Sequence, residues 1–333
     1  MNDRPMTDEP TPKVVMAPPA DAESDRRCPQ RMAALPHGHI AWREAGADTG
    51  LPAVVFLHGI GSGSGSWLDL LQRVGRSRRA LAWDAPGYGD SAPLPVPRPL
   101  AADYALVLGQ WLQAAGVREL VLVGHSLGAL VAAAWAAQHR DPAQPRLHNM
   151  VLASPARGYG SAEPAQREAK YRERVDSIER LGPAGLAQAR AAALCAPGAP
   201  AQALATVRAH MARVSLPGYG QAAHMLAHDD LLPLVQRRQP PALGVRVTCG
   251  LLDTITPPAA CEALAQAAGL PFVPLPGLGH ACYVEDPAAF EAALADSLAV
   301  ADGLARASSP SAPAEPSPAS DTALSPVAPD HRT

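Results

Sequence analysis

No run of uncharged apolar residues in this 333-residue sequence approaches the ~18 needed for a membrane-spanning helix. The formal net charge is only −3, and we interpret the four arginines between residues 73 and 79 as a solvated surface, not a nucleic-acid footprint. The chain starts with charged residues and prolines, where a secretory signal would carry an apolar stretch. We therefore expect a cytoplasmic protein that binds neither membranes nor nucleic acid.

Cysteine is scarce and unpaired in the sequence. The five residues Cys28, Cys195, Cys249, Cys261 and Cys282 are odd in number, far apart, and contain no Cys-x-x-Cys pair. That pattern favours free thiols in a reducing compartment over a disulfide framework. His224 and His228 share a helical spacing, but the sequence offers no His-Glu-x-x-His pattern and no evident third ligand. We expect no metal site.

Both ends of the sequence have an unusual composition. Residues 1–36 are rich in proline and charge and lack apolar periodicity, and residues 301–333 are mostly Ala, Ser, Pro and Asp. These features predict two disordered extensions. The second could bind a partner, but its composition favours a passive solvated tail.

Between the ends, short apolar runs alternate with longer helical segments. Buried strands are predicted at 53–57, 80–83, 120–123, 150–153, 245–248 and 272–275, and helices at 100–115, 127–140, 258–268 and 286–299. Strands without strict alternation indicate a sheet covered on both faces, so we expect an α/β fold with a mostly parallel, doubly wound sheet. The alternating segment 37–44 predicts an outer antiparallel strand. Residues 160–240 hold no strand candidate and are too long for a loop, which indicates a helical cap between core segments 37–159 and 241–300.

Chemistry is indicated first by the segment Gly124-His-Ser-Leu-Gly128, which matches Gly-x-Ser-x-Gly. It falls between a predicted strand and a predicted helix, where a tight turn would project the Ser126 hydroxyl above the sheet. The two glycines lack side chains that would collide in such a turn. We predict that Ser126 is a nucleophile and that the backbone N–H of Leu127 is one donor to an oxyanion.

A serine nucleophile needs a base and an orienting acid, which in this arrangement follow it in the order acid, then histidine. Asp253 comes just after a predicted strand, and His280 lies in a glycine-rich loop before the last predicted helix. We predict that Ser126, Asp253 and His280 form a catalytic triad. After the first central strand, the loop His58-Gly-Ile-Gly-Ser62 can turn backbone N–H groups toward the site, with Ile60 as the second oxyanion donor and Gly61 as the alternative.

These motifs together resemble the α/β-hydrolase superfamily, in the branch of small esterases, enol-lactonases and meta-cleavage C–C hydrolases. The resemblance spans roughly residues 37–300 and includes Asp84-Ala-Pro-Gly-Tyr-Gly-Asp-Ser91. It implies a helical cap before the acid-bearing strand, a turn role for Asp84, and neither metal nor organic cofactor. Serine as nucleophile disfavours the haloalkane dehalogenases and epoxide hydrolases of this fold, which use aspartate. The elbow Gly-His-Ser-Leu-Gly also departs from the Gly-Asn-Ser-Met-Gly typical of C–C hydrolases.

The resulting hypothesis is a serine hydrolase that cleaves a small carboxylic ester or lactone through an acyl-enzyme. A C–C bond hydrolase and a ligand-binding, receptor-like protein of the same fold are the alternatives. The resemblance suggests Tyr219, His224 and Met225 in the cap as substrate-binding residues. The cap arginines Arg167, Arg172, Arg174 and Arg180 could steer an acidic substrate, although most are expected to face solvent. The partner is a small molecule, and the oligomeric state is not indicated.

Overall fold

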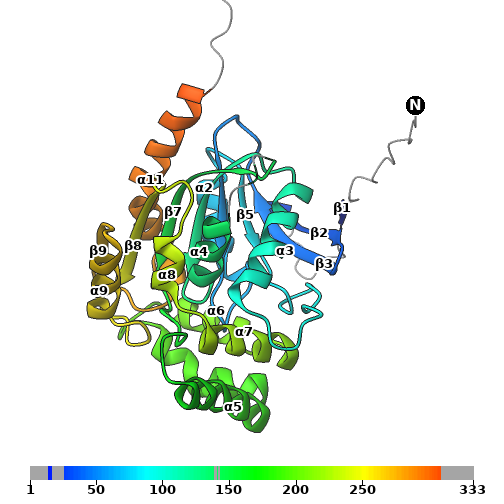
Figure 1. The fold of residues 1–333 in the computed structure, drawn as a ribbon, viewed down its shortest axis with the longest axis vertical. Coiled ribbons are helices and arrows are strands. Elements are labelled where there is room, and N and C mark those ends of the chain that lie inside the picture. The colour runs from blue at the N-terminus through cyan, green and yellow to red at the C-terminus, as the bar shows by residue number, and fades with distance from the viewer. Residues whose placement is uncertain (1–13, 17–25, 139–140, 142, 309–333) are drawn as a thin grey trace, which may run out of the picture.

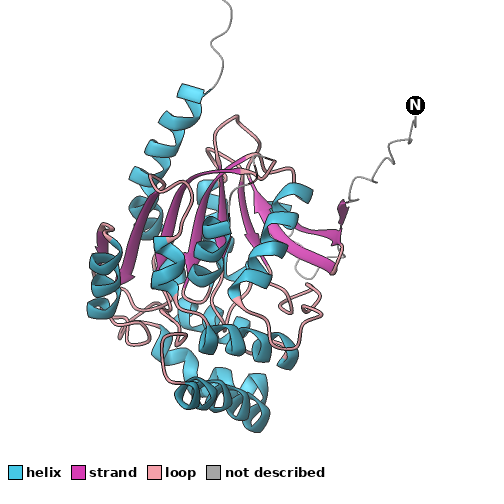
Figure 2. Ribbon diagram, viewed as in Figure 1, coloured by secondary structure: helices cyan, strands magenta, loops and turns pink. Residues whose placement is uncertain are grey.

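The computed structural model describes residues 14–16, 26–138, 141 and 143–308. Within these residues, one sheet of nine strands has helices on both faces (Figures 1 and 2). The strands are β1 (Val14–Met16), β2 (Gln30–Leu35), β3 (Gly38–Ala45), β4 (Ala53–Leu57), β5 (Ala80–Trp83), β6 (Glu119–His125), β7 (Arg146–Ala153), β8 (Gly244–Gly250) and β9 (Phe272–Leu275).

The sheet order is β1-β2-β3-β5-β4-β6-β7-β8-β9. From β5 to β9 every neighbouring pair is parallel, whereas β1, β2 and β3 pair in antiparallel fashion and β3 joins β5 antiparallel. The expected α/β fold, with a mostly parallel sheet and an outer antiparallel strand, is confirmed.

The central strands are buried on both sides because helices cover both faces. Along β4, Val55 packs into the cluster on one face, while Val54 and Phe56 pack into the cluster on the other. Side chains of α3 (Ala101–Ala114), α4 (Gly128–Gln138), α8 (Leu231–Gln236) and α9 (Pro258–Ala268) build the first cluster. Those of α2 (Leu68–Val74) and α11 (Pro287–Ser308) build the second. This two-sided burial explains the apolar, non-alternating strand sequences.

A group of helices between β7 and β8 lies beyond the ends of the central strands, at the bottom of Figure 1. It comprises α5 (Pro164–Arg190), the 3-10 helix η2 (Ala191–Leu194), α6 (Ala201–Met211) and α7 (Leu216–His228). Helix α5 bends where Gly182 has φ 65° and Pro183 follows. The predicted cap, residues 160–240, also includes α8, but α8 packs against α4 in the sheet layer. The helices that lie beyond the strand ends therefore stop before α8.

Parts of both predicted disordered extensions form regular secondary structure in the described residues. Residues 30–35, expected to be disordered, form β2, because their backbone pairs with β3 across a tight turn even though most side chains are only half-buried. Residues 301–308 continue α11, where buried Ala301 and Ala305 face the core and Asp302 pairs with Arg78 at 2.6 Å. The remainder of the predicted extensions, 1–13, 17–25 and 309–333, lies outside the described residues.

None of the helices that the structure describes combines the length and apolar character needed to cross a membrane. All five cysteines lie in the described ranges and are free thiols.

Candidate active site

Ser126 lies on the tight turn between β6 and α4. Its φ is 52°, a left-handed conformation that is costly for a non-glycine residue and is a mark of functional turns. The turn is held because the Ser126 amide donates to the Ala153 carbonyl at 2.9 Å, and the Ser126 carbonyl accepts from Ala156 at 3.1 Å. The structure thus places the serine where the sequence predicted it, at the end of a central strand.

The two glycines around Ser126 are required by close backbone contacts. A Cβ on Gly124 would lie 2.6 Å from the Gly128 carbonyl oxygen, and a Cβ on Gly128 would overlap the Leu57 carbonyl oxygen. Neither obstacle is the end of a flexible side chain, so neither can move aside cheaply. Glycine at both positions lets α4 approach β4 closely enough to form the turn.

Asp253 follows β8 and is almost fully buried. One carboxylate oxygen accepts from the amides of Ile255 and Thr256, at 2.8 and 2.9 Å, and the other accepts from the Thr256 hydroxyl at 2.8 Å. Burial alone would raise the pKa of this carboxyl, but the bonds from His280 and Thr256 outweigh it and hold the pKa well below the ordinary value. Asp253 is therefore ionised at neutral pH.

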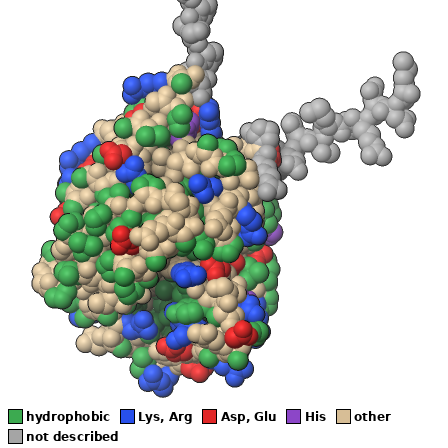
Figure 3. All heavy atoms as spheres, turned by 60° about the vertical axis from the view of Figure 1, so that its left-hand side comes forward, with side chains coloured by type: hydrophobic (Ala, Val, Ile, Leu, Met, Phe, Trp, Pro, Cys, Tyr) green, Lys and Arg blue, Asp and Glu red, His purple; other side chains and the backbone are tan. Residues whose placement is uncertain are grey.

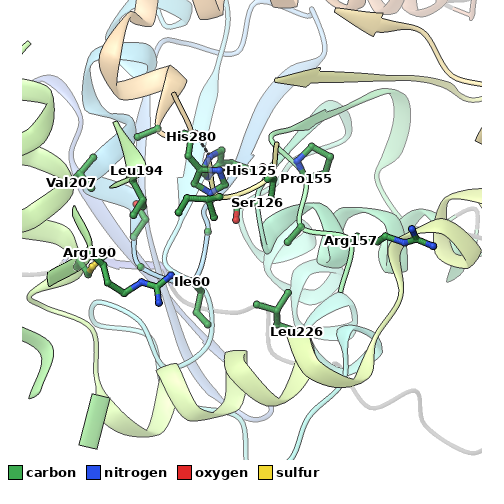
Figure 4. A pocket seen from close by; sticks show the side chains of 18 of the residues that line it. Ile60, His125, Ser126, Pro155, Arg157, Arg190, Leu194, Val207, Leu226 and His280 are labelled. Carbon is green, nitrogen blue, oxygen red and sulfur yellow. Dashed lines mark hydrogen bonds between the residues drawn. The ribbon is translucent and has the colours of Figure 1, made fainter. Parts of the chain in front are cut away.

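His280 reaches Asp253 from the loop after β9. Its Nδ1 donates to the Asp253 Oδ2 at 2.8 Å, and both side chains are nearly inaccessible. Because Nδ1 carries this proton, Nε2 is the ring atom available to accept another proton. No partner for Nε2 occurs among the described residues, and Figure 4 shows the ring beside Ser126. The structure therefore brings together the three residues of the predicted triad.

The glycine-rich loop after β4 lies against the same serine. A Cβ on Gly59 would come within 3.0 Å of the Ser126 Cβ and 3.4 Å of its hydroxyl oxygen, so only glycine leaves this approach open. The backbone amides of Ile60 and Leu127 form no hydrogen bond within the described ranges. The amide of Gly61, the alternative donor, is likewise unused within these ranges. Unused N–H donors beside the serine are what an oxyanion requires.

His58 shapes this loop, as the sequence predicted. Its Nδ1 donates to the Gly59 carbonyl at 2.8 Å, and its Nε2 accepts from the Ala85 amide at 3.0 Å. Burial lowers the pKa of His58 to about 4, so the neutral ring holds two loops together. Asp84 likewise accepts from the Ser64 amide and hydroxyl, at 2.7 and 3.0 Å, which fits the turn role that the resemblance implied.

A cavity of about 400 Å³ opens at Ser126 and extends between the loops at the strand ends and the helices of the cap (Figures 3 and 4). Apolar side chains from the cap and the core line much of it, together with the hydroxyl groups of Ser62, Ser66 and Tyr283. These apolar residues include Leu186, Leu194, Val207, Met211, Leu226 and Val284. Its size and mixed lining suit a small organic molecule.

Of the three predicted substrate-binding residues, the structure places one at the cavity. Tyr219 lines it, whereas His224 and Met225 do not. Met225 points into the core and is fully buried. His224 is held by a bond between its Nδ1 and the Pro99 carbonyl at 3.0 Å and stacks on His228 with ring centroids 4.0 Å apart. The prediction for these two residues was wrong because they follow Tyr219 by five and six positions and therefore lie on other faces of the helix.

Two cavity residues and one residue beside the cavity escaped sequence reasoning. Arg190 ends α5, and no sequence pattern indicates that its side chain turns toward the cavity (Figure 4). Tyr283 hydrogen-bonds to Ser66 at 3.0 Å and stacks on Trp67 with ring centroids 3.7 Å apart. Beside the cavity, Glu285 accepts from the amides of Gly279 and Ala196, which ties the His280 loop to the cap. The closeness of Tyr283 to His280 in the sequence was a signal that could have found it.

No group of three His, Cys, Asp or Glu side chains in the described ranges is arranged to hold a metal ion.

Comparisons with known proteins identify relatives over most of the chain. The model of the alpha/beta hydrolase family matches residues 54–293. A protein of Klebsiella pneumoniae named "Putative carbamate hydrolase RutD" is 31% identical over 272 residues, which cover 77% of this chain and 95% of that protein.

Solved structures show the same architecture. A hydrolase from Pseudomonas aeruginosa is 27% identical with a TM-score of 0.68, over 80% of this chain and 97% of that one. The enol-lactonase of Burkholderia xenovorans is 22% identical with a TM-score of 0.67, over 80% of this chain and 99% of that one, and it supports the fold alone.

Proposed function

The chain belongs to the alpha/beta hydrolase family, and from that premise we propose that it is a serine hydrolase that cleaves small carboxylic esters or lactones. The observation that carries the proposal is the 2.8 Å bond between His280 Nδ1 and Asp253 Oδ2, beside a serine on a strained turn. An oriented, neutral imidazole next to a hydroxyl is the arrangement that makes serine nucleophilic at neutral pH.

The first half-reaction acylates the serine. His280 Nε2 takes the proton of the Ser126 hydroxyl as its oxygen attacks the carbonyl carbon, and the carbonyl electron pair moves onto oxygen. The amides of Ile60 and Leu127 donate to this oxyanion. When the oxyanion collapses, the carbon–oxygen ester bond breaks and the imidazolium returns its proton to the departing alkoxide. In a lactone this alcohol stays attached to the acyl group.

The second half-reaction releases the acid. A water molecule gives a proton to His280 and adds to the acyl carbon, and collapse of the second oxyanion expels Ser126, which recovers its proton. Throughout, Asp253 remains ionised because its pKa is held low, and its charge stabilises the imidazolium. The chain's own residues therefore supply the nucleophile, the base and the oxyanion donors.

A second candidate substrate comes from the relatives named for carbamate hydrolysis, which match nearly their whole length. A carbamate also presents a carbonyl carbon to a nucleophile, so the same residues could attack it. The discriminating experiment incubates the full chain with p-nitrophenyl butyrate, γ-butyrolactone and ethyl carbamate, and with the Ser126→Ala variant as control.

The proposal expects turnover of the ester or the lactone by the wild-type chain and none by Ser126→Ala. Turnover of the carbamate alone would select the second candidate. If a ring-fission dienoate, incubated in parallel, were the only compound consumed, that result would select C–C hydrolysis. Turnover undiminished in Ser126→Ala would contradict the serine mechanism. Binding without cleavage of any compound would favour a receptor-like role.

A further inference from the structure

The cavity lining carries charged side chains of one sign only. Its residues include Arg157, Arg174 and Arg190, and no aspartate, glutamate or lysine. Within the described ranges, none of the three arginines forms an ion pair. In the space-filling view, basic side chains flank the hollow on the lower part of the molecule (Figure 3). A positively charged wall that no protein carboxylate neutralises attracts an anionic ligand.

Two of these arginines come from the two halves of one bent helix. Arg174 precedes the bend of α5 at Gly182, and Arg190 follows it. Because φ of Gly182 is 65° and Pro183 follows, the second half of the helix changes direction. Figure 4 shows the guanidinium of Arg190 directed into the cavity toward Ile60, whereas Arg157 points away from Ser126. We therefore consider Arg174 and Arg190 as the arginines that could bind an anion in the cavity.

Tyr219 supplies a third group at the same place. Its side chain is 5% exposed and lines the cavity, and its hydroxyl has no hydrogen-bond partner among the described residues. Burial raises the pKa of Tyr219, while Arg174 and Arg190 act in the opposite direction, so both guanidinium groups lie within electrostatic reach of the phenol. Because this hydroxyl lines the cavity and has no protein partner there, it is available to donate its proton to a ligand.

The surroundings leave these groups available. Arg174 donates to the Lys170 carbonyl at 3.1 Å and lies over the ring of Tyr159, contacts that orient it without neutralising its charge. Glu173 also lies within electrostatic reach of both arginines, but it is exposed and pairs with Lys170 at 2.9 Å.

We propose that Arg174, Arg190 and the Tyr219 hydroxyl bind a carboxylate carried by the substrate at a position remote from the bond that is cleaved. Guanidinium groups match the planar fork of a carboxylate, and the phenol completes its coordination. This inference rests on the proposed function for its catalytic test, and a binding test separates the two.

The catalytic test uses ester pairs that differ only by a terminal methyl group or carboxylate. Methyl hexanoate is compared with monomethyl adipate for an anion on the acyl side, and hexyl acetate with 6-acetoxyhexanoate for an anion on the alcohol side. The site predicts that kcat/KM is at least about tenfold higher for the anion in one pair, a factor that corresponds to about 1.4 kcal/mol. Arg174→Gln and Arg190→Gln should each remove most of that preference.

Arg180→Gln is the matched control. It removes the same charge from the same helix, but its exposed side chain does not line the cavity. The preference should survive in this variant, because Arg180 does not line the cavity. An equal loss of preference in all three variants would instead indicate an effect of overall charge and contradict the anion site.

The binding test titrates adipate into the full chain by calorimetry, which requires no turnover. Adipate should bind, with Arg190→Gln and Tyr219→Phe weakening it by about tenfold and a few-fold and Arg180→Gln leaving it unchanged. Adipate binding without hydrolysis of any ester would uphold the anion site and overturn the proposed function. Ester hydrolysis without anion preference, together with no adipate binding, would overturn the anion site alone.

Discussion

His125 donates its Nε2 proton to the backbone carbonyl oxygen of His280 at 2.8 Å. A carbonyl only accepts, so this nitrogen carries the proton. Burial, reinforced by the adjacent His280 ring, lowers the pKa of His125 to about 3, and the ring is neutral near pH 7. The bond joins the turn that carries Ser126 to the loop that carries His280, so the residue before the candidate nucleophile positions the candidate base.

His125→Ala should lower kcat by about 10–100-fold, because the His280 loop loses its anchor and small displacements at a reacting centre are costly. Steady-state kinetics on p-nitrophenyl butyrate measure the effect. His39→Ala, at an exposed position, serves as the control and should retain wild-type kcat. A His125→Ala protein with unchanged kcat would show that this bond does not position His280.

Asp253→Asn should retain the fold and lower kcat by about 10⁴-fold. The neutral amide cannot stabilise an imidazolium. Its NH2 group can also donate to His280 Nδ1, which moves the ring proton to Nε2 and leaves no nitrogen to accept the serine proton. Comparing kcat with the thermal midpoint of both proteins separates lost chemistry from lost structure. Loss of less than tenfold in kcat would show that Asp253 is not the orienting acid.

Sequence reasoning located the central elements closely, because they are governed by local patterns. The predicted strands 53–57 and 80–83 coincide with β4 and β5, since runs buried on both faces are apolar throughout. The Ser126 turn was equally accessible, because its glycines are fixed by backbone contacts. By contrast, β2 was missed, since only one of its residues is buried and the strand owes its structure to pairing with β3.

The cap was predicted only as a set of helices. Which side chains reach the cavity depends on how each helix is rotated and on the direction that α5 takes after Gly182, and local sequence patterns specify neither. Tyr219 was therefore placed correctly, whereas His224 and Met225 were not, and Arg190 was overlooked. Tertiary packing, and not local sequence, therefore determines which cap side chains are in a position to contact a substrate.

Gly128→Ala should reduce the free energy of unfolding by about 1–3 kcal/mol or more, because the added Cβ overlaps the Leu57 carbonyl oxygen. Gly303→Ala is the control, since that glycine occupies an exposed position of α11 with open space around it, and there alanine should stabilise by roughly 0.5–1 kcal/mol. Chemical denaturation of both variants tests the contrast. Equal effects would show that the close approach at Gly128 is not needed.

Asp84 predicts a pH dependence of stability. Burial raises the pKa of this carboxyl to about 6, despite its bonds from Ser64. The native state therefore binds more protons than the unfolded state between about pH 4 and 6, and the free energy of unfolding falls as pH rises through that window. A displacement of about two pKa units corresponds to about 3 kcal/mol.

Asp84→Asn cannot ionise, so denaturation curves at pH 4, 5, 6 and 7 should show the variant gaining stability relative to wild type as pH rises. A constant difference between the two proteins across these pH values would refute the raised pKa.

The central claim is that the Ser126 hydroxyl is the nucleophile, and reaction with a fluorophosphonate tests it most directly. Intact-protein mass spectrometry should show one added equivalent on the wild-type chain and on Ser77→Ala, which alters an exposed serine away from the cavity, and none on Ser126→Ala. Labelling of Ser126→Ala at the wild-type rate would contradict the account.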